Sequence, residues 1–205
     1  MNNRLILSCI FLTSCVNSEY QLLYDLAKSN LLGVDDIIID QDFLQARNYS
    51  FIKVSIGKSE VFVMSLLSVN DEEFEWLGRN GLRLKTKYGR VIETYGLDHN
   101  YEALDKSRFV DYTNVTDMSI LVKLDSPDAI FNLNMSYERS SVEAVLDNQN
   151  TAYKLQEKFK SSSSFRWSGI NEYWYDANSY EPLKTIHHIH PYVEPLEIEF
   201  YYKYK

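Results

Sequence analysis

The spacing of the apolar residues changes near residue 50, and this change restricts the fold more than any other feature. Before that point apolar residues recur at helical spacing, and from Phe51 onward they mostly alternate with a period of two. A period of two places successive side chains on opposite faces of a strand. Because the apolar segments are short and separated by only a few residues, they favour antiparallel strands joined in sequence.

The alternation predicts a series of strands after residue 50. Their ranges are 51–56, 60–67, 74–77, 82–86, 90–94, 118–124, 130–139, 141–146, 171–175, 183–190 and 196–202. Asn80-Gly81 predicts a tight turn, and Lys87-Tyr88-Gly89 predicts a hairpin connection. Residues 98–107 are typical of a loop or a short helix, 151–160 fit a strand or a helix, and 161–164 indicate a turn.

A helix is predicted ahead of these strands, at about residues 19–31. Ser18 and Gln21 have the spacing of a capping box, with Ser18 as the N-cap, and Gly33 suits the C-terminal cap. We therefore expect a mostly β fold. It consists of an antiparallel meander sheet, arranged as a sandwich or an open barrel-like sheet, with one N-terminal helix in a single domain.

The first residues have the pattern of a targeting segment. A polar start with one positive charge, Arg4, is followed by an apolar run at 5–12 that is too short to span a bilayer as a helix. Leu12-Thr13-Ser14-Cys15 then resembles the bacterial lipoprotein signal, the lipobox. The resemblance implies that residues 1–14 are a signal peptide, that Cys15 carries the lipid, and that 15–205 form the mature domain. The alternative is a buried N-terminal helix with an incidental cysteine.

This processing restricts both chemistry and location. It removes Cys9, so the mature chain has no free thiol for a disulfide or for nucleophilic catalysis. Several acyl chains on Cys15 make a durable membrane anchor. Val16 stands where an aspartate would resemble an inner-membrane retention signal. We therefore expect a lipid-anchored protein of a Gram-negative outer membrane that faces the periplasm.

Composition and motifs exclude several other functions. The chain has 21 Lys+Arg against 29 Asp+Glu, a net charge of −8, which disfavours nucleic-acid binding. It has 7 glycines and none of the glycine-rich nucleotide loops or nucleophile elbows. We expect no cofactor.

Three histidines form the pattern that most suggests metal chemistry. On a strand His188 and His190 would share a face, with His187 on the other. Zinc needs a third or fourth ligand, and neither a mature thiol nor an HExxH motif supplies one. We predict an exposed or aromatic-packed strand here and no metal site.

Several segments resemble the YjbF/GfcB lipoproteins of capsule and exopolysaccharide gene clusters. They are Gly89-Arg90-Val91-Ile92-Glu93-Thr94-Tyr95-Gly96-Leu97, after a strand with Trp76; Asn171-Glu172-Tyr173-Trp174-Tyr175-Asp176; and Pro182-Leu183-Lys184-Thr185 with Pro191. The resemblance extends over nearly the whole chain and implies a mostly antiparallel β fold. The sequence departs from it at Asn80, where an acidic residue is common, and at Tyr180-Glu181, where a glycine is common.

The same segments supply the candidate binding residues, which are Trp76, Arg90, Tyr95 and Tyr173. Arg90 has two interpretations: a surface ion pair beside a glycine turn, which we favour, or part of a polar surface for a partner protein or a sugar. Aromatic side chains can stack on sugar rings. Alternation places Tyr173 and Tyr175 opposite Trp174, and we assign Trp174 to core packing.

Two classes of function remain. The first is a non-enzymatic accessory lipoprotein that binds proteins of a polysaccharide export cluster, or the polysaccharide, and this role is the one that the resemblance implies. The second is a periplasmic polysaccharide-modifying enzyme, a carboxylate-based hydrolase. Such a hydrolase needs two carboxyl groups about 5–10 Å apart. The sequence contains no motif that marks such a pair.

Overall fold

The computed structural model describes residues 36–58, 60–145, 150–162 and 166–203. The predicted signal peptide, Cys15 and the predicted helix at 19–31 lie outside the described residues. No helix in the described part of the chain is long and apolar enough to cross a membrane.

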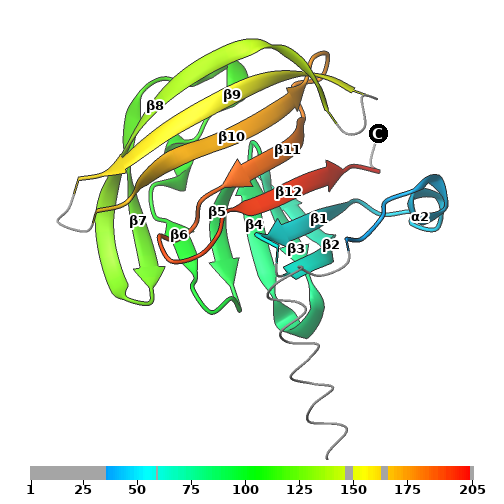
Figure 1. Ribbon diagram of the computed structural model, residues 1–205, viewed down its shortest axis with the longest axis horizontal. Coiled ribbons are helices and arrows are strands. Elements are labelled where there is room, and N and C mark those ends of the chain that lie inside the picture. The colour runs from blue at the N-terminus through cyan, green and yellow to red at the C-terminus, as the bar shows by residue number, and fades with distance from the viewer. Residues whose placement is uncertain (1–35, 59, 146–149, 163–165, 204–205) are drawn as a thin grey trace, which may run out of the picture.

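The described residues form twelve strands (Figure 1). They are β1 (Phe51–Ile56), β2 (Glu60–Asn70), β3 (Glu73–Leu77), β4 (Arg83–Lys87), β5 (Arg90–Tyr95), β6 (Tyr101–Ala103), β7 (Met118–Asp125), β8 (Asp128–Val145), β9 (Asn150–Ser161), β10 (Ser168–Asp176), β11 (Pro182–His187) and β12 (Leu196–Tyr201). Three short 3₁₀ helices lie at Arg79–Gly81, Lys106–Arg108 and Tyr112–Asn114. The mostly β, antiparallel prediction is confirmed.

The sheet closes on itself, so the predicted sandwich or open sheet is corrected to a closed barrel. Each strand pairs antiparallel with its neighbours in sequence, and β1 also pairs with β12. Phe51, for example, is paired with Tyr201 on one side and with Ser65 on the other. Closure satisfies the backbone groups of both terminal strands, which would otherwise be exposed edges. Local alternation is the same in an open and a closed sheet, so the sequence pattern does not distinguish them.

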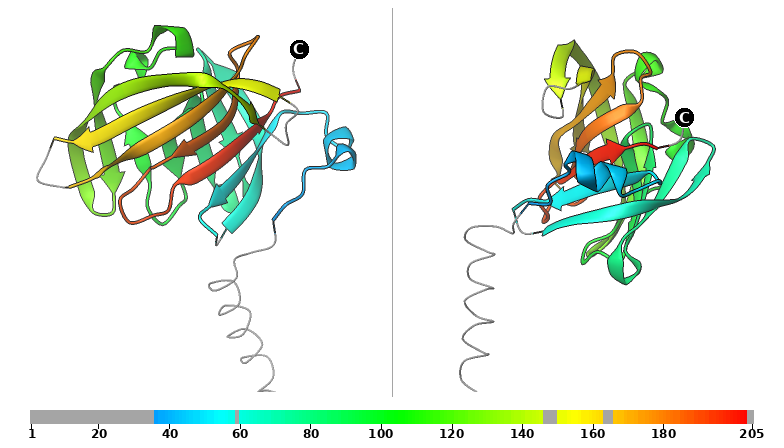
Figure 2. Two further views of the ribbon diagram at one scale, coloured as in Figure 1. Left: turned by 45° about the horizontal axis from the view of Figure 1, so that its top comes forward. Right: turned by 90° about the vertical axis from the view of Figure 1, so that its right-hand side faces the viewer.

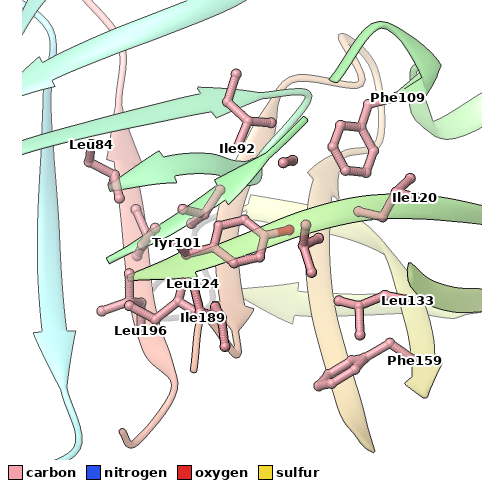
Figure 3. Close-up of a cluster of buried hydrophobic side chains, with 14 of the residues drawn as sticks. Leu84, Ile92, Tyr101, Phe109, Ile120, Leu124, Leu133, Phe159, Ile189 and Leu196 are labelled. Atoms are coloured by element: carbon pink, nitrogen blue, oxygen red, sulfur yellow. The ribbon is translucent and has the colours of Figure 1, made fainter. Parts of the chain in front are cut away.

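The interior of the barrel is filled by the inward face of each strand. Ile52 and Val54 of β1 and Ile198 and Phe200 of β12 are at most 2% exposed. Figure 3 shows part of this core, in which side chains from β4, β5, β7, β8 and β12 gather around Tyr101. The largest buried cluster takes residues from β1 to β9 and from β12, and the inward tyrosines of β10, Tyr173 and Tyr175, form a second cluster with Leu155 of β9.

One short α-helix, α2 (Gln41–Gln45), precedes β1, and the apolar spacing of the sequence does not predict it. Its N-cap is Asp40, whose carboxylate accepts a hydrogen bond from the Phe43 amide at 2.8 Å. The helix lies outside the barrel wall (Figure 2), and Phe43 packs edge-on against Phe51 at 5.6 Å. It therefore buries Phe51 on the outer face of β1.

The structure corrects some of the predicted segments and decides one that the sequence left open. Within 98–107, Tyr101–Ala103 forms β6, held by a 2.9 Å hydrogen bond from the Tyr101 amide to the Thr94 hydroxyl. The predicted strands at 130–139 and 141–146 are parts of one strand, β8, because a bulge between Ser140 and Val142 interrupts the alternation without ending the pairing. The ambiguous segment 151–160 is strand β9.

Candidate functional site

A buried ion pair crosses the interior of the barrel. Arg90 begins β5, Glu157 lies in the middle of β9, and both side chains are 0% exposed. The Arg90 Nε donates to Glu157 Oε2 at 3.0 Å. Arg90 was expected in a surface ion pair, and this expectation is corrected: the side chain points inward, where Glu157 compensates its charge.

Glu157 is hydrogen-bonded through both of its oxygens. Its Oε1 accepts from the Asn171 side-chain amide at 2.8 Å and from the Tyr173 hydroxyl at 2.8 Å. The Tyr173 hydroxyl also lies 3.0 Å from Nδ1 of His187. Because its single proton goes to Glu157, the hydroxyl accepts from His187, which places the imidazole proton on Nδ1.

The electrostatics of this network favour a charged pair beside a neutral imidazole. Burial alone raises the pKa of Glu157, but Arg90 and the donated hydrogen bonds bring that pKa below its ordinary value. Burial alone lowers the pKa of Arg90, and Tyr175 and Glu157 bring it above its ordinary value. Burial lowers the pKa of His187 to about 4. At neutral pH the pair is therefore ionised and His187 is uncharged.

Aromatic rings enclose the guanidinium of Arg90. Its central carbon lies 5.0 Å from the ring centroid of Tyr173, 5.5 Å from that of Tyr137 and 5.6 Å from that of Phe109. These distances allow cation–π attraction. Nη1 donates to the Val110 carbonyl at 3.3 Å, and Nη2 has no hydrogen-bond partner among the described residues. The network joins β5, β9, β10 and β11 without reaching solvent.

The segments that carry the family resemblance meet at this network. Gly89 precedes Arg90 at φ +78°, and its carbonyl accepts from the Thr185 hydroxyl at 2.8 Å. The Tyr175 hydroxyl donates to the neighbouring Tyr88 carbonyl at 2.9 Å. A Cβ on Gly89 would lie 2.9 Å from Cβ of Pro182. The glycine–arginine turn, the Asn171–Asp176 segment and the Pro182–Thr185 segment thus form one packed unit.

The four candidate binding residues occupy different environments. Arg90, Tyr173 and Trp76 are each 0% exposed. The indole nitrogen of Trp76 donates to the Thr86 hydroxyl at 2.9 Å inside the core. Only Tyr95, at 65% exposed, presents its ring to the surface. Binding through these residues stays a prediction, and Arg90 and Tyr173 are the two that the fold brings together.

The tryptophan of the Asn171–Asp176 segment lies on the other face from Tyr173. Trp174 is 8% exposed, and Nζ of Lys154 and Nζ of Lys184 lie 4.8 Å and 5.7 Å from its ring. Tyr173 and Tyr175 point into the barrel, so this segment is buried on both faces. The predicted alternation and the packing role of Trp174 are confirmed: Trp174 lies in a small buried cluster with Ala152, while the tyrosines face the barrel interior.

The predicted strand at 183–190 is corrected: β11 ends at His187, so His188 and His190 lie beyond it and the three histidines take separate places. His188 Nδ1 lies 3.2 Å from the Asn171 side-chain oxygen, and His190 stacks on His99 with centroids 4.4 Å apart. The described residues contain no group of three or more His, Cys, Asp or Glu side chains that could hold a metal ion.

Glu157 is the site residue that the sequence analysis does not single out. It stands between Leu155 and Phe159 at a spacing of two, and both neighbours are buried on the same inward face. A carboxylate in the middle of an apolar face implies a buried partner. The sequence indicates this inward position of Glu157 only if 151–160 is taken to be a strand, because the spacing of two places side chains on one face only in a strand.

Pockets lie on the surface of the described part of the barrel. One of about 410 Å³ is at the α2 end, which is the end where β1 begins, β12 ends and the β2–β3, β4–β5 and β10–β11 turns lie. A second, of about 360 Å³ at the opposite end, is lined by Arg79, Asn80 and His99 among others. A third, of about 220 Å³, is beside Tyr95.

The chain is a closed antiparallel barrel, and the segments that carry the family resemblance pack against one another around its buried network. A family model described as "Group 4 capsule polysaccharide lipoprotein gfcB, YjbF" matches residues 24–201. The chain belongs to this family of capsule-associated lipoproteins, as the resemblance of its motifs implies.

Two similar proteins come from Escherichia coli strain K12. The "Uncharacterized lipoprotein GfcB" is 29% identical over 91 residues, which are 44% of this chain and 42% of that relative's length. The crystal structure of the hypothetical lipoprotein YmcC has a TM-score of 0.68 at 18% identity, covering 91% of this chain and 95% of that one. The second similarity shows a shared fold.

Proposed function

We propose that this protein is an outer-membrane lipoprotein, anchored through Cys15, that assists capsule or exopolysaccharide production without catalysing a bond change. Its mature domain, 15–205, faces the periplasm and binds proteins of the export cluster or the polysaccharide. The family's link to capsule polysaccharide supports this role. The lipobox at residues 12–15 supports the anchor.

The proposal rests on one observation: Glu157 is buried, and both of its carboxylate oxygens are already ion-paired or hydrogen-bonded. A catalytic carboxyl group must reach the substrate, and a general acid must hold a proton near neutral pH. Glu157 is 0% exposed and ion-paired, with a pKa held below its ordinary value. The network that Glu157 forms with residues of the family segments therefore holds strands together and offers no acid or nucleophile to a polymer.

The hydrolase alternative depends on carboxylates at the surface. Glu72, Asp111 and Glu181 line the pocket at the α2 end, and they are the group that a hydrolase would use. Hydrogen bonds from Thr113 lower the pKa of Asp111, which opposes a role for it as a proton donor.

The proposal is tested by deletion and complementation. Deleting the gene should reduce surface polysaccharide, and the variants Glu72→Gln, Asp111→Asn and Glu181→Gln should each restore it. The purified protein should leave the polymer's chain length and substituents unchanged. A folded carboxamide variant that fails to complement, together with polymer cleavage by the wild-type protein, would establish the hydrolase instead.

The anchor has its own test. Mass spectrometry of membrane-extracted protein should find an acylated Cys15 as the first residue. Cys15→Ala should block processing and release the protein from the membrane fraction, and retention of normal processing in this variant would contradict the proposal.

A further inference from the structure

The pocket at the α2 end has the size and position of a binding site. At about 410 Å³ it falls within the range of roughly 300–1,000 Å³ typical of small-molecule sites. Its lining comes from the β2–β3, β4–β5 and β10–β11 turns with adjoining strand ends, from the β6–β7 connection that supplies Asp111 and Thr113, and from the end of β12. The β10–β11 turn and the end of β12 lie together at the right of Figure 1. An extended ligand can reach this end of the barrel from solvent.

An exposed aromatic ring is held in place at this pocket. Tyr180 is 43% exposed and lines the pocket. Its ring stacks on Tyr112 at 5.8 Å and 18° and on Tyr153 at 5.9 Å and 15°. Since the other two rings also stack on each other at 5.7 Å, the three form a supported platform. Aromatic faces of this kind pack against the C–H face of a sugar ring.

The polar groups of the pocket define the charge of its ligand. Glu72, Asp111 and Glu181 supply carboxylate acceptors, and Thr113 and Ser179 supply hydroxyl groups. The described residues that line it include no Lys, Arg or His. The guanidinium of Arg139 lies outside this lining, 5.6 Å from the Tyr112 ring, and donates to the Thr113 carbonyl. An anionic ligand would therefore meet three carboxylates with no cation in the lining, whereas the carboxylates can accept from hydroxyl and amide N–H donors.

The two other pockets described above lack this combination. The described lining of the opposite-end pocket contains no Phe, Tyr or Trp. Beside Tyr95, the carboxylates of Glu75 and Glu93 are paired with Arg83 and Lys85, at 3.6 Å and 2.8 Å. Of these three pockets, the one at the α2 end combines an aromatic ring held by neighbouring rings with carboxylate acceptors and has no cation in its lining.

We infer that the pocket at the α2 end binds uncharged sugar units of a polysaccharide, namely hexoses or N-acetylhexosamines. A C–H face of the sugar packs on Tyr180, and its hydroxyl or acetamido groups donate to the carboxylates. This inference rests on the proposed accessory function and deepens it, because it locates contact with the polymer on the surface of the barrel.

Titration of the purified protein with oligosaccharides tests the inference. The uncharged probes are chitohexaose, cellohexaose and maltohexaose, and the anionic probe is hexagalacturonate, with binding followed by NMR shifts and calorimetry. At least one uncharged probe should bind saturably and perturb Tyr180, and hexagalacturonate should not. Failure of all three uncharged probes, or equal binding of hexagalacturonate, would overturn the inference.

A pair of variants separates the site from general effects. Tyr180 has φ +58°, which a glycine adopts without strain, so Tyr180→Gly removes the ring from a fold that tolerates the change. We expect it to weaken binding about tenfold, the size of a lost aromatic contact. Tyr192→Ala removes a tyrosine that is 69% exposed and outside the lining of this pocket, and should leave binding unchanged. Equal effects of the two variants would contradict the assignment.

The same variants distinguish this inference from the proposed function. If deletion lowers surface polysaccharide and folded Tyr180→Gly restores it fully, the accessory role stands and the pocket is not its site. If deletion leaves surface polysaccharide unchanged, the accessory role fails whatever the protein binds in solution.

Discussion

At the scale of single residues, Arg90 and Glu157 stabilise the barrel only as a pair. Removing one partner of a buried ion pair leaves an uncompensated charge, at a cost of about 3–5 kcal/mol. We therefore expect Arg90→Met and Glu157→Gln each to lower the free energy of unfolding by about that much. The double variant removes both charges and should lose clearly less than the sum. Urea denaturation of all four proteins measures the coupling, and additive losses would show that the two side chains act independently.

His187 makes stability depend on pH. Burial lowers its pKa to about 4 from an ordinary value of 6.5, and the groups around it are Glu157, Arg90, Tyr173 and His188. Its contribution is therefore fully present above pH 6.5. It is lost as pH falls toward 4, because the unfolded chain takes up the proton first. The loss reaches about 3 kcal/mol.

The matched variant His187→Gln removes this titration while keeping a donor for the Tyr173 hydroxyl. Comparing urea midpoints between pH 7.5 and pH 4.5 should show a steeper loss for the wild type. The remaining histidines titrate in both proteins and cancel in the difference. Parallel pH profiles would mean that folding does not lower the pKa of His187.

At the scale of elements, two glycine turns form a matched pair. Gly89 and Gly81 both have φ +78°, so an alanine at either position bears the same backbone strain, about 1–2 kcal/mol. At Gly81 a Cβ meets nothing within 4 Å, whereas at Gly89 it lies 2.9 Å from Pro182. We expect Gly89→Ala to lower the thermal midpoint clearly more than Gly81→Ala. Equal shifts would mean that the β4–β5 and β10–β11 turns are not packed together.

The sequence predicts well those strands whose own residues carry the apolar alternation. The predicted and the observed bounds of β1 are both 51–56, because apolar residues occupy every position of this segment except Lys53 and Ser55. β6 is missed because three residues carry no periodic signal, and the neighbouring strands β5 and β7 determine their conformation. β8 is predicted as two strands because a bulge shifts the alternation by one residue.

The candidate site is less predictable than the strands because its contacts are distant in sequence. The family segments are visible as motifs, but Arg90 and Glu157 are 67 residues apart and no local spacing joins them. Closure of the barrel brings β5 and β9 to opposite sides of one interior. Tyr180 likewise becomes part of a platform only when the β10–β11 turn meets Tyr112 and Tyr153.

At the scale of the whole molecule, closure makes the last strand as important as any in the middle. β12 pairs with β1 along six positions and with β11 along four. Its inward residues Leu196, Ile198 and Phe200 are at most 2% exposed. In a sandwich a terminal strand can be an edge whose loss leaves the rest folded. In a closed barrel the same loss opens two edges and one side of the core.

Truncation distinguishes these two architectures. A chain that ends after Pro195 lacks β12, so the backbone groups of β1 and β11 lose their partners and the core is exposed to water. We expect this chain to lose its cooperative thermal transition and to elute as aggregates on size-exclusion chromatography. A chain that ends at Lys203 keeps β12 and the 2.9 Å hydrogen bond from the Lys203 amide to Ser50, and should behave as the full-length protein does. A monomeric, cooperatively unfolding chain without β12 would mean that closure does not hold this fold together.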